Sequence, residues 1–226
     1  MIRFFFKELP ADMRIAMFGG TFDPFHRGHA AIARFVLETG RADRILFMPA
    51  PVPPHKAEKT LSPYAARRKM AELGLGAELD GTRMAISDLE CSRPGRSYSI
   101  DTLKALAGMF PGDRIILLLG GDSLATLHLW YRAKEIVRDF EVLAYPRPGF
   151  DVSAASLARN WPEKTAGKLA ASVMTDAPVF PFSSTELRAV LGRGENPPPE
   201  ALEPAELEWI RAGNLYRNDN GKDVEI

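Results

Sequence analysis

Residues 14–29 read RIAMFGGTFDPFHRGH, and this stretch decides the fold. Its first part, residues 14–18, is a short apolar run that ends in Gly19-Gly20, which predicts a buried strand leading into a tight turn. Apolar residues then recur at helical spacing over residues 27–39, and Gly40 ends that pattern. A buried strand that leads directly into a helix is the repeating unit of α/β proteins.

The same alternation continues along the chain. Apolar runs predict further strands over residues 44–48, 83–86, 114–119, 141–145 and 179–182. Helical patterns predict helices over residues 62–75 (with Ser62 as cap), 99–109, 123–138, 183–191 and 204–212. Residues 49–54 contain four prolines and predict an extended loop, whereas residues 146–178 are less regular. We therefore expect an α/β fold, a Rossmann-like doubly wound parallel sheet with helices on both faces.

Size and composition are those of an ordinary globular protein. The 226 residues predict a single domain, with a core over about residues 14–182, a small C-terminal helical part over about 183–217, and mobile tails. The hydrophobic fraction is 46% and the charged fraction 26%, which excludes disordered, collagen-like and coiled-coil classes.

Charge and cysteine content narrow the functional class. The 29 Lys and Arg residues balance 29 Asp and Glu residues, so we expect no nucleic-acid or membrane-surface partner, and any anion site must be local. The single cysteine, Cys91, excludes an internal disulfide and fits a reducing cytoplasm. Because no apolar run is long enough to cross a bilayer, we expect a cytoplasmic protein.

The segment after the first strand is suited to bind an anion. In open α/β sheets, ligands bind at the carboxyl ends of the strands. Gly19 and Gly20 allow backbone N–H groups to approach a phosphate, and the N-terminus of the following helix adds positive potential. His26 and His29 are three residues apart, so on a first helical turn they share one face and can donate to phosphate oxygens.

Other interpretations of this segment remain open. His26 can simply cap the helix while His29 packs in the core. The His-x-x-His spacing can also bind zinc, although no third ligand is evident in the sequence. The segment matches neither the P-loop pattern nor the dinucleotide-binding glycine pattern, which argues against a P-loop kinase and a Rossmann dehydrogenase.

A second candidate segment, residues 182–188, reads FSSTELR. Its hydroxyl residues predict a helix start with free N–H groups, and Arg188 follows about one turn later, an arrangement suited to phosphates. In isolation it would be an ordinary helix cap with a surface arginine.

Together the two segments resemble the signatures of the nucleotidylyltransferase superfamily. Residues 19–29 are similar to its (T/H)xGH region, and residues 182–188 resemble its ISSTxLR-type region, with Phe182 replacing the usual Ile. Further segments resemble nicotinate-nucleotide adenylyltransferases: VPPHK at 52–56, RSYSIDTL at 96–103, GGDSL at 120–124, Trp130-Tyr131, Arg147-Pro148-Gly149 and Leu215-Tyr216-Arg217. The resemblance spans roughly residues 14–217, nearly the whole chain.

The resemblance implies a nucleotidylyltransferase-type fold and a reaction. ATP and nicotinate mononucleotide are the expected partners, and deamido-NAD and pyrophosphate the products, with the 5′-phosphate attacking the α-phosphorus directly. Such a displacement needs alignment and charge neutralisation rather than a protein nucleophile. The resemblance also implies Mg²⁺, held mainly by the ATP phosphates, so we expect no metal-ligating residue. Both a monomer and a homo-oligomer fit.

The resemblance further implies roles for individual residues. Four are expected around the reacting phosphates: His26, His29, Lys56 and Arg188. An ATP site is expected to comprise Gly19, Gly20, Thr21, Phe22, Gly120, Asp122, Ser183, Ser184 and Thr185. A pyridine-nucleotide site is expected to comprise Tyr98, Ser99, Thr102, Trp130, Tyr131 and Arg147, with Trp130 stacking on the ring.

The chain departs from the family after Pro49. The family often has Asn residues there, near the pyridine carboxylate, whereas this chain has Ala50 and Pro51, and Pro51 has no N–H to donate. We still expect preference for the acid over the amide. The alternatives are an adenylyltransferase with nicotinamide mononucleotide or pantetheine phosphate as acceptor, and a non-catalytic nucleotide-binding regulator.

Overall fold

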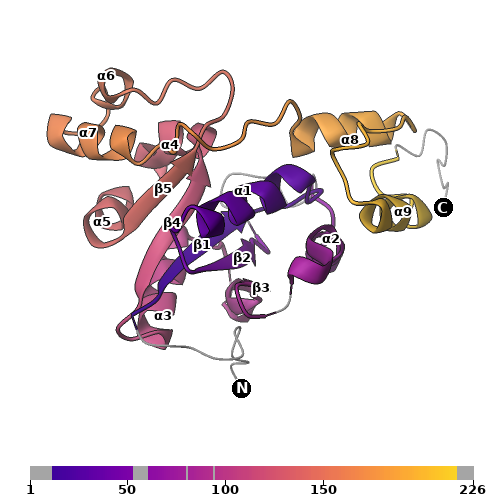
Figure 1. Ribbon diagram of the computed structural model, residues 1–226, viewed down its shortest axis with the longest axis horizontal. Coiled ribbons are helices and arrows are strands. Elements are labelled where there is room, and N and C mark those ends of the chain that lie inside the picture. Colours follow the sequence, from indigo (N-terminus) through magenta and orange to yellow (C-terminus); the bar gives the residue numbers. More distant parts are fainter. Residues whose placement is uncertain (1–11, 53–60, 80, 94, 218–226) are drawn as a thin grey trace, which may run out of the picture.

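The computed structural model describes residues 12–52, 61–79, 81–93 and 95–217. In that part of the chain, one parallel sheet has the order β3-β2-β1-β4-β5 (Figure 1). Its strands are β1 (Arg14–Gly20), β2 (Arg44–Pro49), β3 (Met84–Ile86), β4 (Arg114–Gly120) and β5 (Glu141–Tyr145). The chain moves outward from β1 to β3 and then returns to the other side of β1, so the strand order reverses between β1 and β4. The expected α/β fold with a parallel sheet is confirmed.

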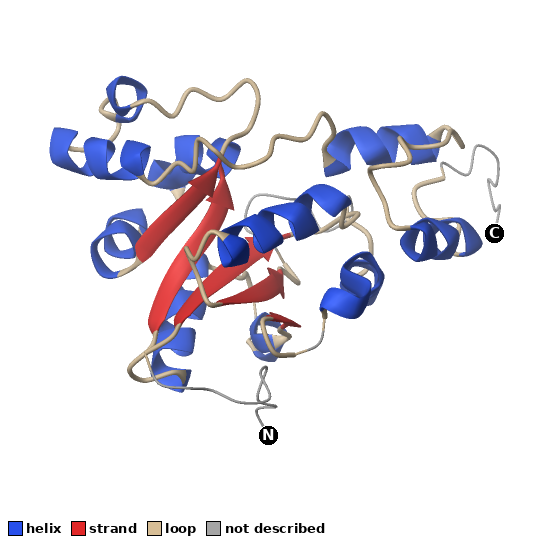
Figure 2. Cartoon of the chain, in the orientation of Figure 1, coloured by secondary structure: helices blue, strands red, loops and turns tan. Residues whose placement is uncertain are grey.

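Helices cover both faces of the sheet (Figure 2). They are α1 (Arg27–Glu38), α2 (Tyr64–Leu75), α3 (Ser99–Met109), α4 (Gly121–Thr126), α5 (Ala133–Asp139), α6 (Ala154–Leu157), α7 (Glu163–Ala171), α8 (Ser184–Gly192) and α9 (Pro204–Ala212). Three short 3₁₀ helices complete the described elements: η2 (Gly76–Glu78), η3 (Leu89–Ser92) and η4 (Leu127–Leu129).

Alternate residues of the central strands point into two separate cores. Ala16 and Phe18 of β1 lie in one core, with residues of α1, α2, α8 and α9. Ile15 and Met17 lie in the other, with residues of α3, α5 and α7. This alternation follows from the period of two in a strand, and it explains why the strand sequences are apolar without interruption.

Two expected elements are wrong. Residues 179–182 do not form a strand. Instead Val173 forms an isolated parallel bridge with Ala144, and Pro178 and Pro181 remove N–H donors that a strand in the later segment would need. The single helix expected over residues 123–138 is divided into α4, η4 and α5 by a turn in which Arg132 adopts a left-handed conformation, with φ of 54°.

Smaller differences concern helix starts and the irregular segment. Pro63, rather than Ser62, occupies the N-cap position of α2. Residues 146–178 contain α6 and α7. These two helices lie at one end of the molecule, and α8 and α9 lie at the other (Figure 1). No helix in the described ranges is long and apolar enough to cross a membrane. The expected mobile tails, residues 1–11 and 218–226, lie outside the described residues.

Candidate active site

A cavity of about 380 Å³ opens at the carboxyl ends of β1 and β4, where the strand order reverses. It is lined by every residue of the expected ATP site: Gly19, Gly20, Thr21, Phe22, Gly120, Asp122, Ser183, Ser184 and Thr185. It is also lined by His26, His29 and Arg188, and by Tyr98, Ser99, Trp130, Tyr131 and Arg147. Lys56 and the PPHK segment lie outside the described residues. The structure therefore brings residues from across the sequence to one cavity.

Two glycines make room at the strand ends. A Cβ at Gly20 would lie 3.1 Å from the ring of Phe22. A Cβ at Gly120 would overlap Oδ1 of Asp122 and would lie 3.1 Å from the ring of Tyr145. A side chain at Gly120 would thus displace the carboxylate of Asp122 from its place at the cavity.

The histidine pair lies at the start of α1. His26 occupies the N-cap position, and the two imidazole rings stack with centroids 3.7 Å apart. The backbone N–H of His26 donates to Nδ1 of His29 at 3.1 Å. Because Nδ1 of His29 accepts this bond, a neutral His29 ring carries its proton on Nε2. The capping interaction therefore selects the tautomer of His29.

Both imidazoles are held in the neutral form. Burial, together with the charge of Arg147, lowers the pKa of His26 to about 3. Burial also lowers the pKa of His29 well below its ordinary value, followed by the effects of His26 and Arg147. At neutral pH each ring thus has one N–H donor and one acceptor nitrogen.

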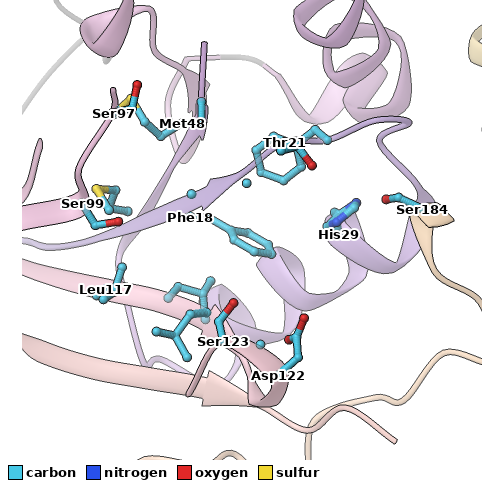
Figure 3. A pocket seen from close by; sticks show the side chains of 18 of the residues that line it. Phe18, Thr21, His29, Met48, Ser97, Ser99, Leu117, Asp122, Ser123 and Ser184 are labelled. Atoms are coloured by element: carbon cyan, nitrogen blue, oxygen red, sulfur yellow. The ribbon is translucent and has the colours of Figure 1, made fainter. Parts of the chain in front are cut away.

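The start of α8 is hydrogen-bonded to the loop that precedes α1. Ser184 Oγ donates to the carbonyl of Pro24 at 2.9 Å, and Arg188 Nη1 donates to the carbonyl of Asp23 at 2.5 Å. Ser183 caps α8 by accepting from the N–H of Glu186 at 3.3 Å. Two helix N-termini, those of α1 and α8, therefore meet at one end of the cavity, a combination that favours bound anions. Figure 3 shows Thr21, His29 and Ser184 together at this end.

The opposite end is formed by the start of α3. Ser97 and Ser99 lie there, away from His29 (Figure 3). The rings of Tyr98 and Tyr131 approach with centroids 4.6 Å apart, and Tyr131 is 53% exposed at the rim. The aromatic side chains at this end offer flat apolar surface, on which a planar ring can stack.

Asp122 and Arg147 line the cavity beside β4 and β5. Their side chains approach at 3.8 Å between Nε of Arg147 and Oδ1 of Asp122. This carboxylate follows the Gly-Gly turn at the start of α4, with Ser123 next to it (Figure 3). It offers hydrogen-bond acceptors on the side of the cavity away from Ser97 and Ser99.

Thr102 is the described site residue that the structure does not bring to the cavity. It is fully buried, and its hydroxyl donates to Oε1 of Glu90 at 2.6 Å. The structure therefore does not bring this hydroxyl to the cavity, because it is bonded to Glu90 in η3. The N–H of Ala50 is also engaged, since it donates to the carbonyl of Gly20 at 2.9 Å.

Sequence reasoning missed several lining residues, among them Met48, Glu90, Ser97, Ser123 and Tyr145. Ser97 and Ser123 lie within the RSYSIDTL and GGDSL segments, so membership of these motifs could have pointed to them. Glu90 lies in a 3₁₀ helix with no periodic pattern to place it. Burial raises its pKa, partly offset by hydrogen bonds from Thr102 and Ser97.

The described residues contain no group of three or more His, Cys, Asp or Glu side chains that could hold a metal ion. Within this part of the chain, the histidine pair thus lacks the third ligand that a zinc site would need.

Comparison with known proteins gives concordant matches. A family model for cytidylyltransferase-like proteins matches residues 17–190. A probable nicotinate-nucleotide adenylyltransferase of Solibacter usitatus is 40% identical over 205 residues, covering 90% of this chain and 100% of that protein. A protein of Synechococcus sp. with the same description is 35% identical, covering 92% of this chain and 96% of its own.

Solved structures show the same fold. Plasmodium falciparum nicotinic acid mononucleotide adenylyltransferase complexed with NaAD superimposes with a TM-score of 0.71 at 18% identity, covering 90% of this chain and 97% of that one. A Vibrio parahaemolyticus protein described as a putative nicotinate-nucleotide adenylyltransferase gives a TM-score of 0.62 at 21% identity, covering 91% and 96%.

Proposed function

The chain belongs to the cytidylyltransferase-like family and, within it, to the nicotinate-nucleotide adenylyltransferases, and we propose that it transfers the adenylyl group of ATP to nicotinate mononucleotide. The products are deamido-NAD and pyrophosphate. One observation carries the proposal: the neutral histidine pair and the start of α8 meet at one end of a cavity at the carboxyl edge of the sheet. This is where an α/β fold binds a nucleotide.

The chemistry is a direct displacement at phosphorus. An oxygen of the mononucleotide 5′-phosphate bonds to the α-phosphorus of ATP, and the bond to the β-phosphate oxygen breaks, so pyrophosphate leaves with that electron pair. In this proposal His29 donates from Nε2 to the reacting phosphate, and His26 lies stacked beside it. Because both rings are neutral, they need not lose a proton before the reaction, and they act by positioning and hydrogen bonding.

The negative charge that develops on the leaving pyrophosphate has to be offset by cationic groups. We assign this role to Arg188, which lines the cavity next to the N-terminus of α8, and to Lys56 from the sequence. Mg²⁺ would enter with ATP, because this end of the cavity presents N–H and hydroxyl donors that suit phosphates rather than a metal ion. When bound, it would offset negative charge on the triphosphate.

The two nucleosides are proposed to lie on opposite sides of the reacting phosphates. Gly120 and Asp122 suit a ribose of ATP, since a carboxylate accepts hydrogen bonds from both hydroxyls. Tyr98, Ser99 and Trp130 suit the pyridine ring, with Tyr131 at the rim. Arg147 approaches Asp122, and its charge contributes to the lowered pKa of His26, so we place it near the phosphate of the mononucleotide.

Preference for the acid would come from α3. Ala50 and Thr102 have their donors engaged elsewhere, so the N-terminus of α3 at Tyr98 and Ser99 supplies the remaining N–H groups and positive potential. A carboxylate accepts these bonds, whereas the NH₂ of an amide would face donors. An unpaired buried group costs about 1–3 kcal/mol, so we expect roughly ten- to a hundredfold preference for the acid.

The test is pyrophosphate release from ATP with three acceptors under identical conditions: nicotinate mononucleotide, nicotinamide mononucleotide and pantetheine phosphate. We expect the highest kcat/KM with the acid. Higher kcat/KM with either of the others would assign a different acceptor. Binding of ATP without turnover on any acceptor would indicate a regulator rather than an enzyme.

A further inference from the structure

The segment that follows α9 returns to the loop in front of the histidines. Tyr216 is 193 residues away from Asp23 in the sequence, yet its hydroxyl donates to Oδ1 of Asp23 at 2.6 Å. Asp23 is fully buried, so this bond is shielded from water. A hydrogen bond to a charged group is roughly twice as strong as one between neutral groups.

Both carboxylate oxygens of Asp23 accept hydrogen bonds. Oδ2 accepts from the N–H of Ser62 at 3.2 Å, and Oδ1 accepts from Tyr216. The buried guanidinium of Arg67 contributes opposite charge nearby and donates to the carbonyls of Ser62 and Thr21. Arg188 holds the backbone carbonyl of Asp23.

The same loop leads to the histidines within three residues. Asp23 precedes Pro24 and Phe25, and His26 follows as the N-cap of α1. The ring of Phe25 is fully buried and packs against His29, with centroids 5.1 Å apart. A shift at Asp23 is thus transmitted to both imidazoles through three residues of backbone and one packed ring.

We propose that Tyr216 is a positioning residue: its bond to Asp23 fixes the loop from Thr21 to His26, so that the C-terminal segment aligns the two imidazoles with the reacting phosphates. This inference rests on the proposed function and adds to it a contribution from a residue outside the cavity. Tyr216 does not line the cavity itself. Burial raises the pKa of Tyr216, followed by the charge of Asp23, so the hydroxyl keeps its proton and remains the donor.

The experiment has to distinguish the contribution of the Tyr216 hydroxyl from that of its ring. The ring of Tyr216 packs against the core that contains α1, α2, α8 and α9. The Tyr216→Phe variant removes the bond to Asp23 and keeps that packing. A matched control is Tyr64→Phe on α2, because Tyr64 donates to Oδ1 of Asp88 at the same 2.6 Å and lies outside the cavity.

The kinetic experiment measures kcat and both KM values for the two variants, with a thermal melt of each. For Tyr216→Phe we expect kcat to fall about ten- to fiftyfold with KM values nearly unchanged, since misplacement of positioned groups affects the transition state most. Tyr64→Phe should keep the kcat of the unmodified protein. A purely structural role would lower the melting temperature and leave the kcat of the folded protein unchanged, which would overturn the proposal.

A double-mutant cycle with Asp23 provides a second, independent measurement of the same contact. The Asp23→Asn variant weakens the same bond from the acceptor side. If Tyr216 acts through Asp23, Tyr216→Phe causes little further loss of kcat in the Asp23→Asn background. Independent, multiplying losses would contradict the proposal.

A readout without turnover separates this inference from the proposed function. Histidine ring NMR signals should move for His26 and His29 in Tyr216→Phe, with the signal of His128 unchanged, whereas Tyr64→Phe should move none of the three. If the unmodified protein shows no turnover but these shifts occur, the proposed function fails and the positioning contact stands. Unmoved signals of His26 and His29 would overturn the positioning contact itself.

Discussion

His29 combines a structural and a chemical task in one ring. Nδ1 accepts from the backbone N–H of His26, and the rings of Phe22 and Phe25 pack around it at centroid distances of 5.0 and 5.1 Å. Only Nε2 is then left to donate to a ligand. The residue is therefore fixed in position and tautomer before substrate binds, which is how a positioned donor lowers a barrier.

We expect His29→Ala to lower kcat by at least about a hundredfold, the usual scale for one lost transition-state donor. Steady-state kinetics with a thermal melt measure it. His128→Ala serves as control, because His128 does not line the cavity. A folded His29→Ala protein with nearly normal turnover would remove His29 from the reaction.

Arg188 is expected to affect the binding of ATP more than the binding of the mononucleotide. We expect Arg188→Ala to raise the KM for ATP about tenfold or more and to affect the KM for the mononucleotide less, because a charge-assisted contact to phosphate is lost. Separate KM determinations decide this. Arg193→Ala is the control on the end of the same helix, where Arg193 pairs with Glu195 at the surface. An equal or larger effect on the mononucleotide would place Arg188 on the acceptor side.

Some features of individual site residues could be predicted from the sequence and others could not. The two motifs predicted the histidines and the α8 residues correctly as neighbours, since each motif joins a strand end or helix start whose position the fold dictates. Nothing in the sequence indicates that Thr102 lies outside the cavity, because its partner, Glu90, lies in an irregular segment. The engaged N–H of Ala50 depends on the pairing of β1 with β2, which a single sequence does not reveal.

At the scale of elements, periodicity predicted all five strands of the sheet and most helices. The strands are continuous apolar runs because both faces are buried. The broken helix over residues 123–138 was missed because its apolar spacing continues across the turn at Arg132. The apolar segment 179–182 was predicted to be a strand, although Pro178 before it and Pro181 within it cannot donate the N–H groups that strand pairing needs.

Packing between α2 and α9 gives a prediction at this scale. A Cβ at Gly74 would lie 2.5 Å from Cδ1 of Phe25 and 2.9 Å from Oε2 of Glu206. Gly74→Ala should therefore lower the free energy of unfolding by about 1–3 kcal/mol, the usual cost of overpacking a core. Urea unfolding measures the change.

Gly167→Ala in α7 is the matched control. A Cβ there meets nothing within 4 Å, so the substitution should raise the free energy of unfolding by about 0.4–1 kcal/mol. The same sign for both variants would show that helix propensity, rather than the contact with Phe25, decides the effect at Gly74.

For the molecule as a whole, the C-terminal helices stabilise the loop that carries the histidines. Arg27 at the start of α1 pairs with Glu203 at the start of α9 at 2.8 Å, and the N–H of Arg27 donates to the carbonyl of Ala201. Figure 1 shows α8 and α9 at the same end of the molecule, next to α2. Stability at this end and alignment in the cavity are thus physically linked.

The buried carboxyl of Glu206 makes the stability of this end of the molecule depend on pH. Glu206 on α9 is fully buried, and neither of its carboxyl oxygens has a hydrogen-bond partner among the described residues. Burial, followed by the charge of Glu203, raises its pKa well above the ordinary value of 4.5. The folded protein therefore keeps this proton at pH values where the unfolded chain has released it.

The sign of the pH effect follows. A raised carboxyl pKa contributes stability that is fully present below the unfolded pKa of about 4.5 and is lost as the pH rises through the folded pKa. Between those two values the loss is at most about 1.4 kcal/mol per pH unit. In Glu206→Gln the side chain no longer titrates, so this loss disappears. The variant should therefore melt close to the unmodified protein at pH 5 and progressively higher above it toward pH 8.

Melting temperatures measured from pH 5 to pH 8 test this. At this chain length about 1 kcal/mol corresponds to roughly 2–4 °C, so the difference is readily measurable. Glu208→Gln is the control, because Glu208 is exposed on the same helix, and its difference from the unmodified protein should not grow with pH. A pH-independent difference for Glu206→Gln would show that Glu206 is already ionised in the folded protein, and that a donor compensates its charge.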